Sequence, residues 1–316
     1  YQDRLKREMS LIKEKGLIPQ LLRAIEVLRL AGDDVPHVTR GSCGSSLVCY
    51  LLGISHIDPV KFNICFSRFL NEFRSSLPDI DYDFPHNQRA DIFLRMAIRW
   101  PGTVARISNH VHFHEKSALR EALRRNGLKG NVPCTELNKY IAQLSSYKRN
   151  KVKKDAKKLE GSFNCYSLHC GGVVYYPHGI PREHLLEGKQ GQLLAQVKLD
   201  KRDISDTGHF KIDVLSSRAL SQLVYAYGVI DGDTPLDLAS PPFTDKMIKM
   251  FETGDNIGIT LAESPLCRSE FIKQKPKTVE DIAKCLALIR PAARQSKVDI
   301  VYDDDAIEII QKALKC

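Results

Sequence analysis

Carboxylates alternate with large apolar side chains in the stretch Leu77-Pro78-Asp79-Ile80-Asp81-Tyr82-Asp83-Phe84. Alternation with a period of two predicts a β-strand, whose successive side chains point to opposite faces. Asp79 and Asp81 would then project from one face, roughly 7 Å apart along the strand. Carboxylates so close repel each other unless a cation lies between them, and hard divalent cations take oxygen ligands. The alternative is a solvent-facing edge strand whose charges discourage pairing with other chains.

A further acidic residue lies in an apolar setting, in the stretch Phe210-Lys211-Ile212-Asp213-Val214. The pattern predicts another strand, and an isolated carboxylate there is costly to bury unless it is paired or holds a metal. Together with Asp79 and Asp81, Asp213 would complete the three-carboxylate site that two-metal nucleotidyl transfer requires. In that chemistry one ion lowers the pKa of a primer 3′-hydroxyl, and the other binds the triphosphate and the leaving pyrophosphate.

A loop rich in glycine and serine runs through Thr39-Arg40-Gly41-Ser42-Cys43-Gly44-Ser45-Ser46 and opens a helix predicted from about Ser45 to Leu52. Backbone amides at a helix start, small hydroxyl groups and an arginine together suit a triphosphate. The spacing is not that of a Walker loop. A Gly/Ser loop can equally cap a helix without holding any ligand.

The composition favours a polyanionic partner. Lys and Arg outnumber Asp and Glu by 47 to 38 in 316 residues, which gives a net charge of +9. Residues 116–160 are helical by pattern, basic and poor in aromatic side chains, and such a field suits a phosphate backbone. A solvated helix face is the alternative. The candidate DNA-binding residues are Lys116, Arg120, Arg124, Lys148, Arg149, Lys151, Lys153 and Lys154.

Nine cysteines occur without a C-x-x-C pair, so neither a zinc ribbon nor a redox motif is indicated. The odd count and scattered spacing favour reduced thiols in a cytosolic protein. No apolar run reaches the length of a membrane span, and no signal peptide is present. Since the chain begins at Tyr1 within a helical pattern, we expect a piece of a longer cytoplasmic protein with no membrane partner.

Apolar periodicity predicts a mixture of helices and strands. The predicted helices cover residues 1–31 with a break at Gly16 and Pro19, 87–100 and 217–229. The predicted strands cover residues 171–176, 193–199 and 210–214. A Pro-rich boundary at 234–243 precedes a further helical region with an apolar break at 257–261. Because strands flank the basic helical block on both sides, we expect that block to be inserted into a single α+β domain.

Two clusters of reactive side chains allow other interpretations. His110, His112 and His114 alternate as ligands on a strand would, although no Cys or acidic cluster lies nearby in the sequence. That absence favours a surface run at a helix start. Cys165 and His169 suggest a Cys–His nucleophile, but no orienting acid can be assigned to them.

Several collinear motifs resemble the α subunit of bacterial DNA polymerase III, the C-family replicative polymerase, almost from end to end. The resembling stretches are Tyr1-Gln2-Asp3-Arg4-Leu5, the loop from Arg40 to Val48, Arg68-Phe69-Leu70-Asn71, the acidic stretch from Pro78 to Phe84, Ala156–Gly161, His169–Val174, Lys211–Leu215, Gly254–Ser264 and Ala287–Pro291. Departures include Thr39 and Ala292, where the family has glycine.

The resemblance implies a palm of the polymerase β-like nucleotidyltransferase type with an inserted helical thumb and a partial helical fingers region. Residues 1–107 and 169–228 would form the palm, 108–168 the basic thumb and 229–316 the partial fingers. It also implies that Asp79, Asp81 and Asp213 are catalytic ligands of two Mg²⁺ ions, with Asp83 in a structural role. The nucleotide-binding residues implied are Arg40, Gly41, Ser42, Ser45, Ser46, Arg68, Arg74, Lys211 and Arg290.

The implied substrates are primer–template DNA and dNTP, in a bacterial cell or a phage-infected host. A sliding clamp or other replisome subunits would bind regions of the family that lie outside this chain. Three functions fit the sequence. They are DNA-templated DNA synthesis, an inactive homologue that serves as a DNA-binding or assembly module, and a template-independent nucleotidyltransferase.

Overall fold

The computed structural model describes residues 1–74, 78–128, 130, 132–133, 135–187, 193–230, 238 and 243–290. The chain divides into two compact units, one of Tyr1–Ile92 with Val214–Cys316 and one of Phe93–Asp213, and each is described by itself. The strands are β1 (Val38–Arg40), β2 (Ile80–Pro85), β3 (Val104–His112), β4 (Phe163–Tyr175), β5 (Ala195–Gln196) and β6 (Phe210–Ser217). Their sheet order in the described part of the chain is β1-β2-β6-β4-β3-β5. This mixture of helices with a largely antiparallel sheet confirms the predicted α+β content.

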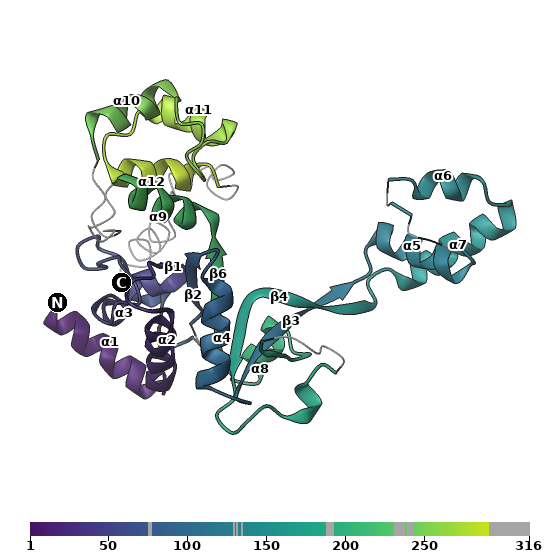
Figure 1. Cartoon of the computed structure of the whole chain (residues 1–316), viewed down its shortest axis with the longest axis horizontal. Coiled ribbons are helices and arrows are strands. Elements are labelled where there is room, and N and C mark those ends of the chain that lie inside the picture. The colour runs from purple at the N-terminus through teal and green to yellow at the C-terminus, as the bar shows by residue number, and fades with distance from the viewer. Residues whose placement is uncertain are drawn as a thin grey trace. The chain divides into compact units, whose positions relative to one another are not determined.

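Two helices open the first unit, α1 (Gln2–Glu14) and α2 (Ile18–Ala31), as Figure 1 shows. The predicted break is confirmed, because Gly16 takes a positive φ of 67° between them. Pro19 lies in the first turn of α2, where the missing N–H group leaves no hydrogen bond unmade. The helix packs against β2, and the Tyr82 hydroxyl donates to the Ala24 carbonyl at 3.1 Å.

Strand β2 carries the acidic stretch and begins one residue after Asp79. The predicted alternation is confirmed, because Asp81 and Asp83 are half-buried while their neighbours form the core face. The buried side chains of that face are Ile80, Tyr82 and Phe84. β1 pairs with β2 in antiparallel register and sets Arg40 directly opposite Asp81. The acidic face of β2 therefore lies beside the start of the Gly/Ser loop.

The helix predicted after the Gly/Ser loop is confirmed, and the loop itself folds into a 3-10 turn. Residues Gly41–Ser45 form a 3-10 turn, η1, and α3 follows over Leu47–Leu51. Ser46 separates the two in an extended conformation, because its hydroxyl accepts the Cys49 N–H at 3.2 Å and so caps α3. A second 3-10 turn, η2 (Phe66–Arg68), follows farther along the chain.

The helix predicted at 87–100 is confirmed as α4 (Arg89–Arg99). Ile92 and Met96 on this helix, and Trp100 directly after it, are all buried.

A long ribbon of β3 and β4 runs through the second unit and leads into three helices at one end (Figure 1). These helices are α5 (Glu115–Arg125), α6 (Leu137–Ala142) and α7 (Ser146–Leu159). They confirm the helical block predicted between strands, and they enclose a core of their own. Its buried residues are Ala122, Leu123, Val132, Leu137, Ile141 and Val152.

Other parts of the second unit differ from prediction. β3 was not predicted, and β4 starts at Phe163 rather than at residue 171. Of the strand predicted at 193–199, Ala195–Gln196 pairs with β3 and Val197 forms an isolated bridge with Leu185. A 3-10 turn η3 (Arg182–His184) and the short helix α8 (Lys201–Asp206) flank β5.

The remaining described helices of the first unit confirm the predictions for that region up to residue 290, and residues 291–316 lie outside the described part of the chain. These helices are α9 (Arg218–Ile230), α10 (Asp245–Thr253), α11 (Pro265–Gln274) and α12 (Val279–Leu288). The last three pack around Phe251, Phe271 and Cys285, with the predicted break at 257–261 between α10 and α11. The Pro-rich boundary at 234–243 lies outside the described residues except for Leu238 and Phe243. Within the described part of the chain, every helix is too short or too polar to cross a bilayer.

Candidate active site

The Gly/Ser loop begins against the acidic face of β2. Arg40 forms an ion pair with Asp83, in which Nη2 donates to Oδ1 at 3.2 Å. Gly41 takes a φ of +81°, a conformation that side-chain-bearing residues adopt only with strain. A Cβ atom at this position would lie 3.6 Å from Asp81 Oδ2. The loop backbone therefore approaches the Asp81 carboxylate closely, and Asp83 orients the loop arginine.

Cys43, inside the loop, also interacts with the residues of the acidic stretch. The buried Cys43 thiol donates to the Asp79 carbonyl oxygen at 3.5 Å. A hydrogen bond with Cys49 raises the pKa of Cys43 well above its ordinary value, and burial and the charges of Asp81 and Asp79 raise it further. Cys43 is therefore a neutral thiol at physiological pH, lying behind the two predicted ligands.

The residues predicted to bind nucleotide divide between the two sides of the loop. Arg40 and Gly41 are exposed and Ser42 is half-buried, so this end of the loop is open to solvent. Ser45 and Ser46 are only 2% and 0% exposed. The Ser46 hydroxyl is already used in capping α3, so a direct phosphate contact is left to the outer end of the loop.

The other predicted arginines of the first unit lie on nearby and distant segments. Arg68 is exposed at the end of η2, and Arg74 donates from Nη1 to the Phe69 carbonyl at 2.6 Å. Arg74 thus braces the backbone beside Arg68. Arg290 is exposed just after α12.

In the second unit, Asp213 is paired on one oxygen only. Lys211 Nζ donates to Asp213 Oδ2 at 2.6 Å, and the two side chains are 5% and 13% exposed. Among the described residues, Asp213 Oδ1 is buried and has no hydrogen-bond partner. A buried carboxylate oxygen without a donor is unfavourable unless a cation satisfies it. This donor chemistry fits an oxygen ligand of Mg²⁺.

His169 lies beside this aspartate as a neutral side chain. Its Nδ1 accepts N–H groups from Gly172 at 2.7 Å and Gly171 at 3.3 Å, so the ring proton is on Nε2. Burial lowers the pKa of His169, although the charge of Asp213 opposes that shift. The 3.9 Å separation from Asp213 Oδ1 is therefore a polar contact and not an ion pair at neutral pH. Because the backbone occupies Nδ1, a Cys–His nucleophile gains no support.

The glycine that binds His169 also faces the strand that carries Asp213. Gly172 lies directly opposite Asp213 in the β4–β6 register. An added Cβ would come within 2.5 Å of Ile107 and 2.8 Å of His169 Nδ1. Arg106 secures the same bend, because its Nη2 donates to the His169 carbonyl at 2.5 Å. Only glycine fits here without displacing the groups beside Asp213.

One cluster of potential metal ligands among the described residues was not predicted from the sequence. His110 lies near Asp200 and Asp203, with ring nitrogens 3.7 Å and 3.5 Å from their carboxylates. The expectation that the three histidines form a run at a helix start was wrong for His110 and His112, which lie on β3. The sequence contains no local sign of this cluster, because His110 lies far along the chain from Asp200 and Asp203. Its groups are already engaged, since Asp200 and Asp203 cap α8 and the Lys198 carbonyl lies 2.7 Å from His110 Nε2.

The predicted DNA-binding residues lie on two packed helices, α5 and α7. Those that are exposed are Lys116, Arg124, Lys148, Lys151, Lys153 and Lys154, whereas Arg120 and Arg149 are half-buried. Arg149 serves the fold, because Nη2 donates to the Ala142 and Leu144 carbonyls at 2.9 Å and 3.2 Å. Asp155, the acid within the basic run, accepts from Asn126 at 3.0 Å.

Comparison with protein-family models gives two adjacent matches. Residues 1–216 match the bacterial DNA polymerase III alpha NTPase domain. The chain belongs to the bacterial DNA polymerase III alpha family. Residues 219–311 match the finger domain of the same subunit. The predicted family is confirmed, and the three predicted catalytic aspartates all lie within the first match.

Relatives of this family align along nearly the whole chain. The DNA polymerase III subunit alpha of Bacillus subtilis is 30% identical over 322 residues, covering 94% of this chain and 29% of the relative. That of Staphylococcus aureus is 31% identical over 317 residues, covering 92% and 29%. An error-prone DNA polymerase of Idiomarina loihiensis is 27% identical over 318 residues, covering 94% and 30%. The chain spans less than a third of the length of these polymerases.

Proposed function

We propose that the chain carries the nucleotidyl-transfer site of a DNA-directed DNA polymerase, which joins a dNTP to a primer 3′-hydroxyl opposite a template. Membership of the polymerase III alpha family supports the reaction class. The observation that carries the proposal is Asp213, whose one oxygen is held by Lys211 while the other is buried without a hydrogen-bond donor among the described residues.

In this proposal Asp79, Asp81 and Asp213 hold two Mg²⁺ ions through their carboxylate oxygens. When bound, the ions lower the pKa of the primer hydroxyl and offset the charge of the triphosphate. Lys211 fixes the rotamer of Asp213 through the 2.6 Å ion pair to Oδ2, which leaves Oδ1 as the oxygen for a metal ion. Gly172 lies opposite Asp213, and the neutral His169 lies 3.9 Å from Asp213 Oδ1.

The triphosphate would lie against the open end of the loop. Arg40 supplies a planar guanidinium that Asp83 already orients, and Gly41 and Ser42 supply backbone and hydroxyl donors. The further predicted contacts are Arg68, Arg74, Lys211 and Arg290. Ser45 and Ser46 would act through the shape of the loop, because both side chains are buried.

The proposed assignment of residues to domains follows that of the family. Residues 1–107 and 169–228 form the palm, 108–168 the thumb, and 229–316 part of the fingers. The exposed cations of α5 and α7 bind the phosphates of primer–template DNA. Partners such as a sliding clamp would bind parts of the polymerase outside this chain.

A primer-extension assay tests the proposal, run with and without template and in Mg²⁺ or EDTA. We expect template-dependent extension that EDTA abolishes. Asp213→Asn should lower the rate by about 10²–10³, as loss of a transition-state electrostatic group does, while DNA binding persists. Asp245→Asn, an exposed acid in the first turn of α10, is the matched control.

Three outcomes would contradict the proposal. Unchanged extension by Asp213→Asn would remove this aspartate from the metal site. Extension that needs no template would favour the template-independent nucleotidyltransferase instead. A chain that binds DNA but neither binds dNTP with Mg²⁺ nor extends a primer would fit the inactive homologue.

A further inference from the structure

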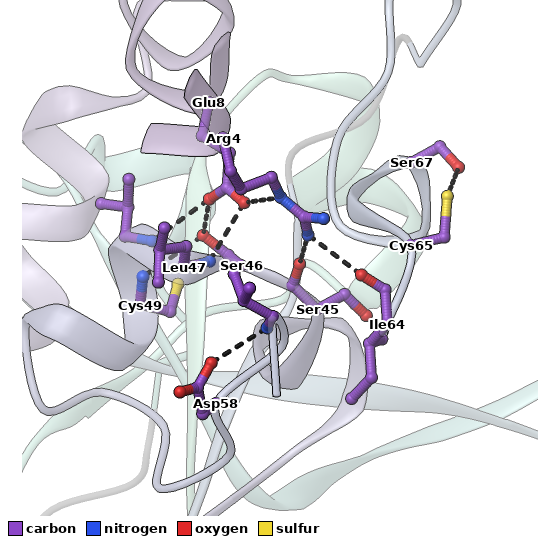
Figure 2. A network of polar contacts seen from close by, with 12 residues as sticks. Arg4, Glu8, Ser45, Ser46, Leu47, Cys49, Asp58, Ile64, Cys65 and Ser67 are labelled. Atoms are coloured by element: carbon purple, nitrogen blue, oxygen red, sulfur yellow. Dashed lines mark hydrogen bonds and ion pairs between the residues drawn. The ribbon is translucent and has the colours of Figure 1, made fainter. Parts of the chain in front are cut away.

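A fully buried carboxylate lies beneath the Gly/Ser loop. Glu8 of α1 is 0% exposed, which is rare for an acid unless it is paired. Its oxygens accept the Ser46 hydroxyl at 2.8 Å and the N–H groups of Leu47 and Val48, both at 3.1 Å (Figure 2). These are the first N–H groups of α3, which have no partner within the helix. Glu8 thus satisfies the start of α3 from the inside of the protein.

Arg4 ties this carboxylate to the carbonyl side of the same loop. Its Nε is 2.5 Å from Glu8 Oε1, and its Nη2 donates to the Ser45 carbonyl at 2.9 Å. The same Nη2 reaches the Ile64 carbonyl at 3.1 Å, in the segment that leads to η2 and Arg68 (Figure 2). One ion pair therefore holds the inner end of the loop and the segment that precedes Arg68.

This arrangement decides which face of the loop is free. The amides at the start of a helix attract anions, but those of α3 are occupied by Glu8. The outer end, Arg40 to Ser42, is left open. The loop needs no nucleotide to satisfy its buried N–H groups, because the Glu8 carboxylate accepts their hydrogen bonds.

We propose that Glu8, oriented by Arg4, is a positioning residue that holds the Gly41–Ser46 loop in its nucleotide-binding shape before the nucleotide arrives. The inference rests on the proposed function, because it assigns Glu8 to the nucleotide site of that reaction. Glu8 acts only through the loop and touches no reacting atom. Its effect therefore falls on dNTP binding more than on the chemical step.

The loop can be probed without nucleotide through its buried thiols. Cys43 and Cys49 are both 0% exposed, whereas Cys165 is exposed and serves as an internal reference. We would label the full chain with N-ethylmaleimide and follow each cysteine by peptide mass spectrometry. Glu8→Ala should label at Cys43 and Cys49 about tenfold faster or more, since hydrogen bonds to a charged group are lost. Glu8→Gln keeps the volume and one acceptor, so it should lie between.

The matched control is Glu14→Ala, which removes an exposed carboxylate from the same helix, α1. Labelling at Cys43 should then equal that of the unaltered chain. Far-UV circular dichroism identifies any variant that fails to fold. If Glu8→Ala fails to fold, the labelling of Glu8→Gln provides the test. A Glu8 variant that folds and labels at Cys43 like the unaltered chain would overturn the proposal.

The nucleotide arm separates this inference from the proposed function. In primer extension, Glu8→Gln should raise the KM for dNTP about tenfold with a smaller change in kcat, and Mg²⁺–dNTP should slow Cys43 labelling. If the unaltered chain extends primers but the Glu8 variants keep its KM, the positioning role is wrong. If Glu8 variants label faster but the unaltered chain neither binds dNTP nor extends primers, the proposed function fails and Glu8 holds a loop of another purpose.

Discussion

At the residue scale, Gly172 is the position where one added methyl group would do most damage beside Asp213. We expect Gly172→Ala to destabilise the chain by roughly 1–3 kcal/mol, the range for overpacking, because Ile107 and His169 fill the space of the new Cβ. Extension activity should fall with the displacement of His169. Urea unfolding followed by fluorescence measures the first effect and primer extension the second.

The matched control for that substitution is Gly228→Ala, in the interior of α9. No atom lies within 4 Å of the Cβ position there among the described residues. Alanine should stabilise the helix by up to about 1 kcal/mol. Equal destabilisation by both substitutions would refute the packing argument at Gly172.

Individual residues were predictable where their signal is local. Asp79, Asp81 and Asp213 stand out because each interrupts an apolar strand pattern. Glu8 was missed because its partners lie 38 to 40 residues away in sequence. A signal was present, since Glu8 falls with Leu5 and Ile12 on the apolar stripe of α1 at steps of three and four.

At the scale of elements, α7 presents a row of exposed lysines. We expect Lys151→Gln with Lys154→Gln to weaken duplex DNA binding and to reduce the slope of log affinity against log salt by about 0.9 for each lost phosphate contact. Both lysines are exposed, unlike Arg149, which joins α7 to α6. Fluorescence anisotropy of labelled DNA across a salt series measures the slope.

A control of equal charge comes from α1. Lys6→Gln with Lys13→Gln also removes two exposed positive charges, but from α1 instead of α7. The salt slope should stay that of the unaltered chain in this variant. If the α1 and α7 pairs lower the slope equally, DNA binding reflects net charge and not a surface on α7.

Helices were easier to predict than strands in this chain, and the reason is physical. α1, α2 and α4 bury one stripe each, so their periodicity is visible in the sequence. β3 lacks a regular alternation because the β3–β4 ladder shifts register at two places and its far end is exposed. Each shift changes which residues face inward, and no local pattern survives that change.

At the scale of the whole molecule, the family and the mixed fold could be predicted from collinear motifs, whereas the use of each polar group could not. The loop illustrates the limit. Its glycines and serines suggest a phosphate site, but the sequence does not say that Glu8 occupies the α3 amides or that Ser46 is buried. Which side of a loop faces the solvent is decided by partners remote in sequence.

Whole-chain stability should fall with pH below neutrality because of His37. Burial, together with the charge of the nearby His56, lowers the pKa of His37 to about 4, against the opposing effect of hydrogen bonds to the Gly53 and Ile54 carbonyls. In the unfolded chain this pKa is near 6.5, so the unfolded state takes up the proton first as pH falls. The stabilising effect of the neutral ring is complete above pH about 6.5 and is lost by pH about 4, a change of at most about 3 kcal/mol.

His37→Phe should remove this part of the pH dependence, because phenylalanine keeps an aromatic ring beside Tyr82 and cannot be protonated. Urea unfolding at about pH 7.5 and about pH 5 measures the difference between the two free energies of unfolding. His178→Phe, at an exposed site, is the control and should keep the full difference. A smaller dependence should persist in His37→Phe, since burial also lowers the pKa values of His169 and His209. If His37→Phe loses as much stability on acidification as the unaltered chain does, His37 is not the group that sets its acid sensitivity.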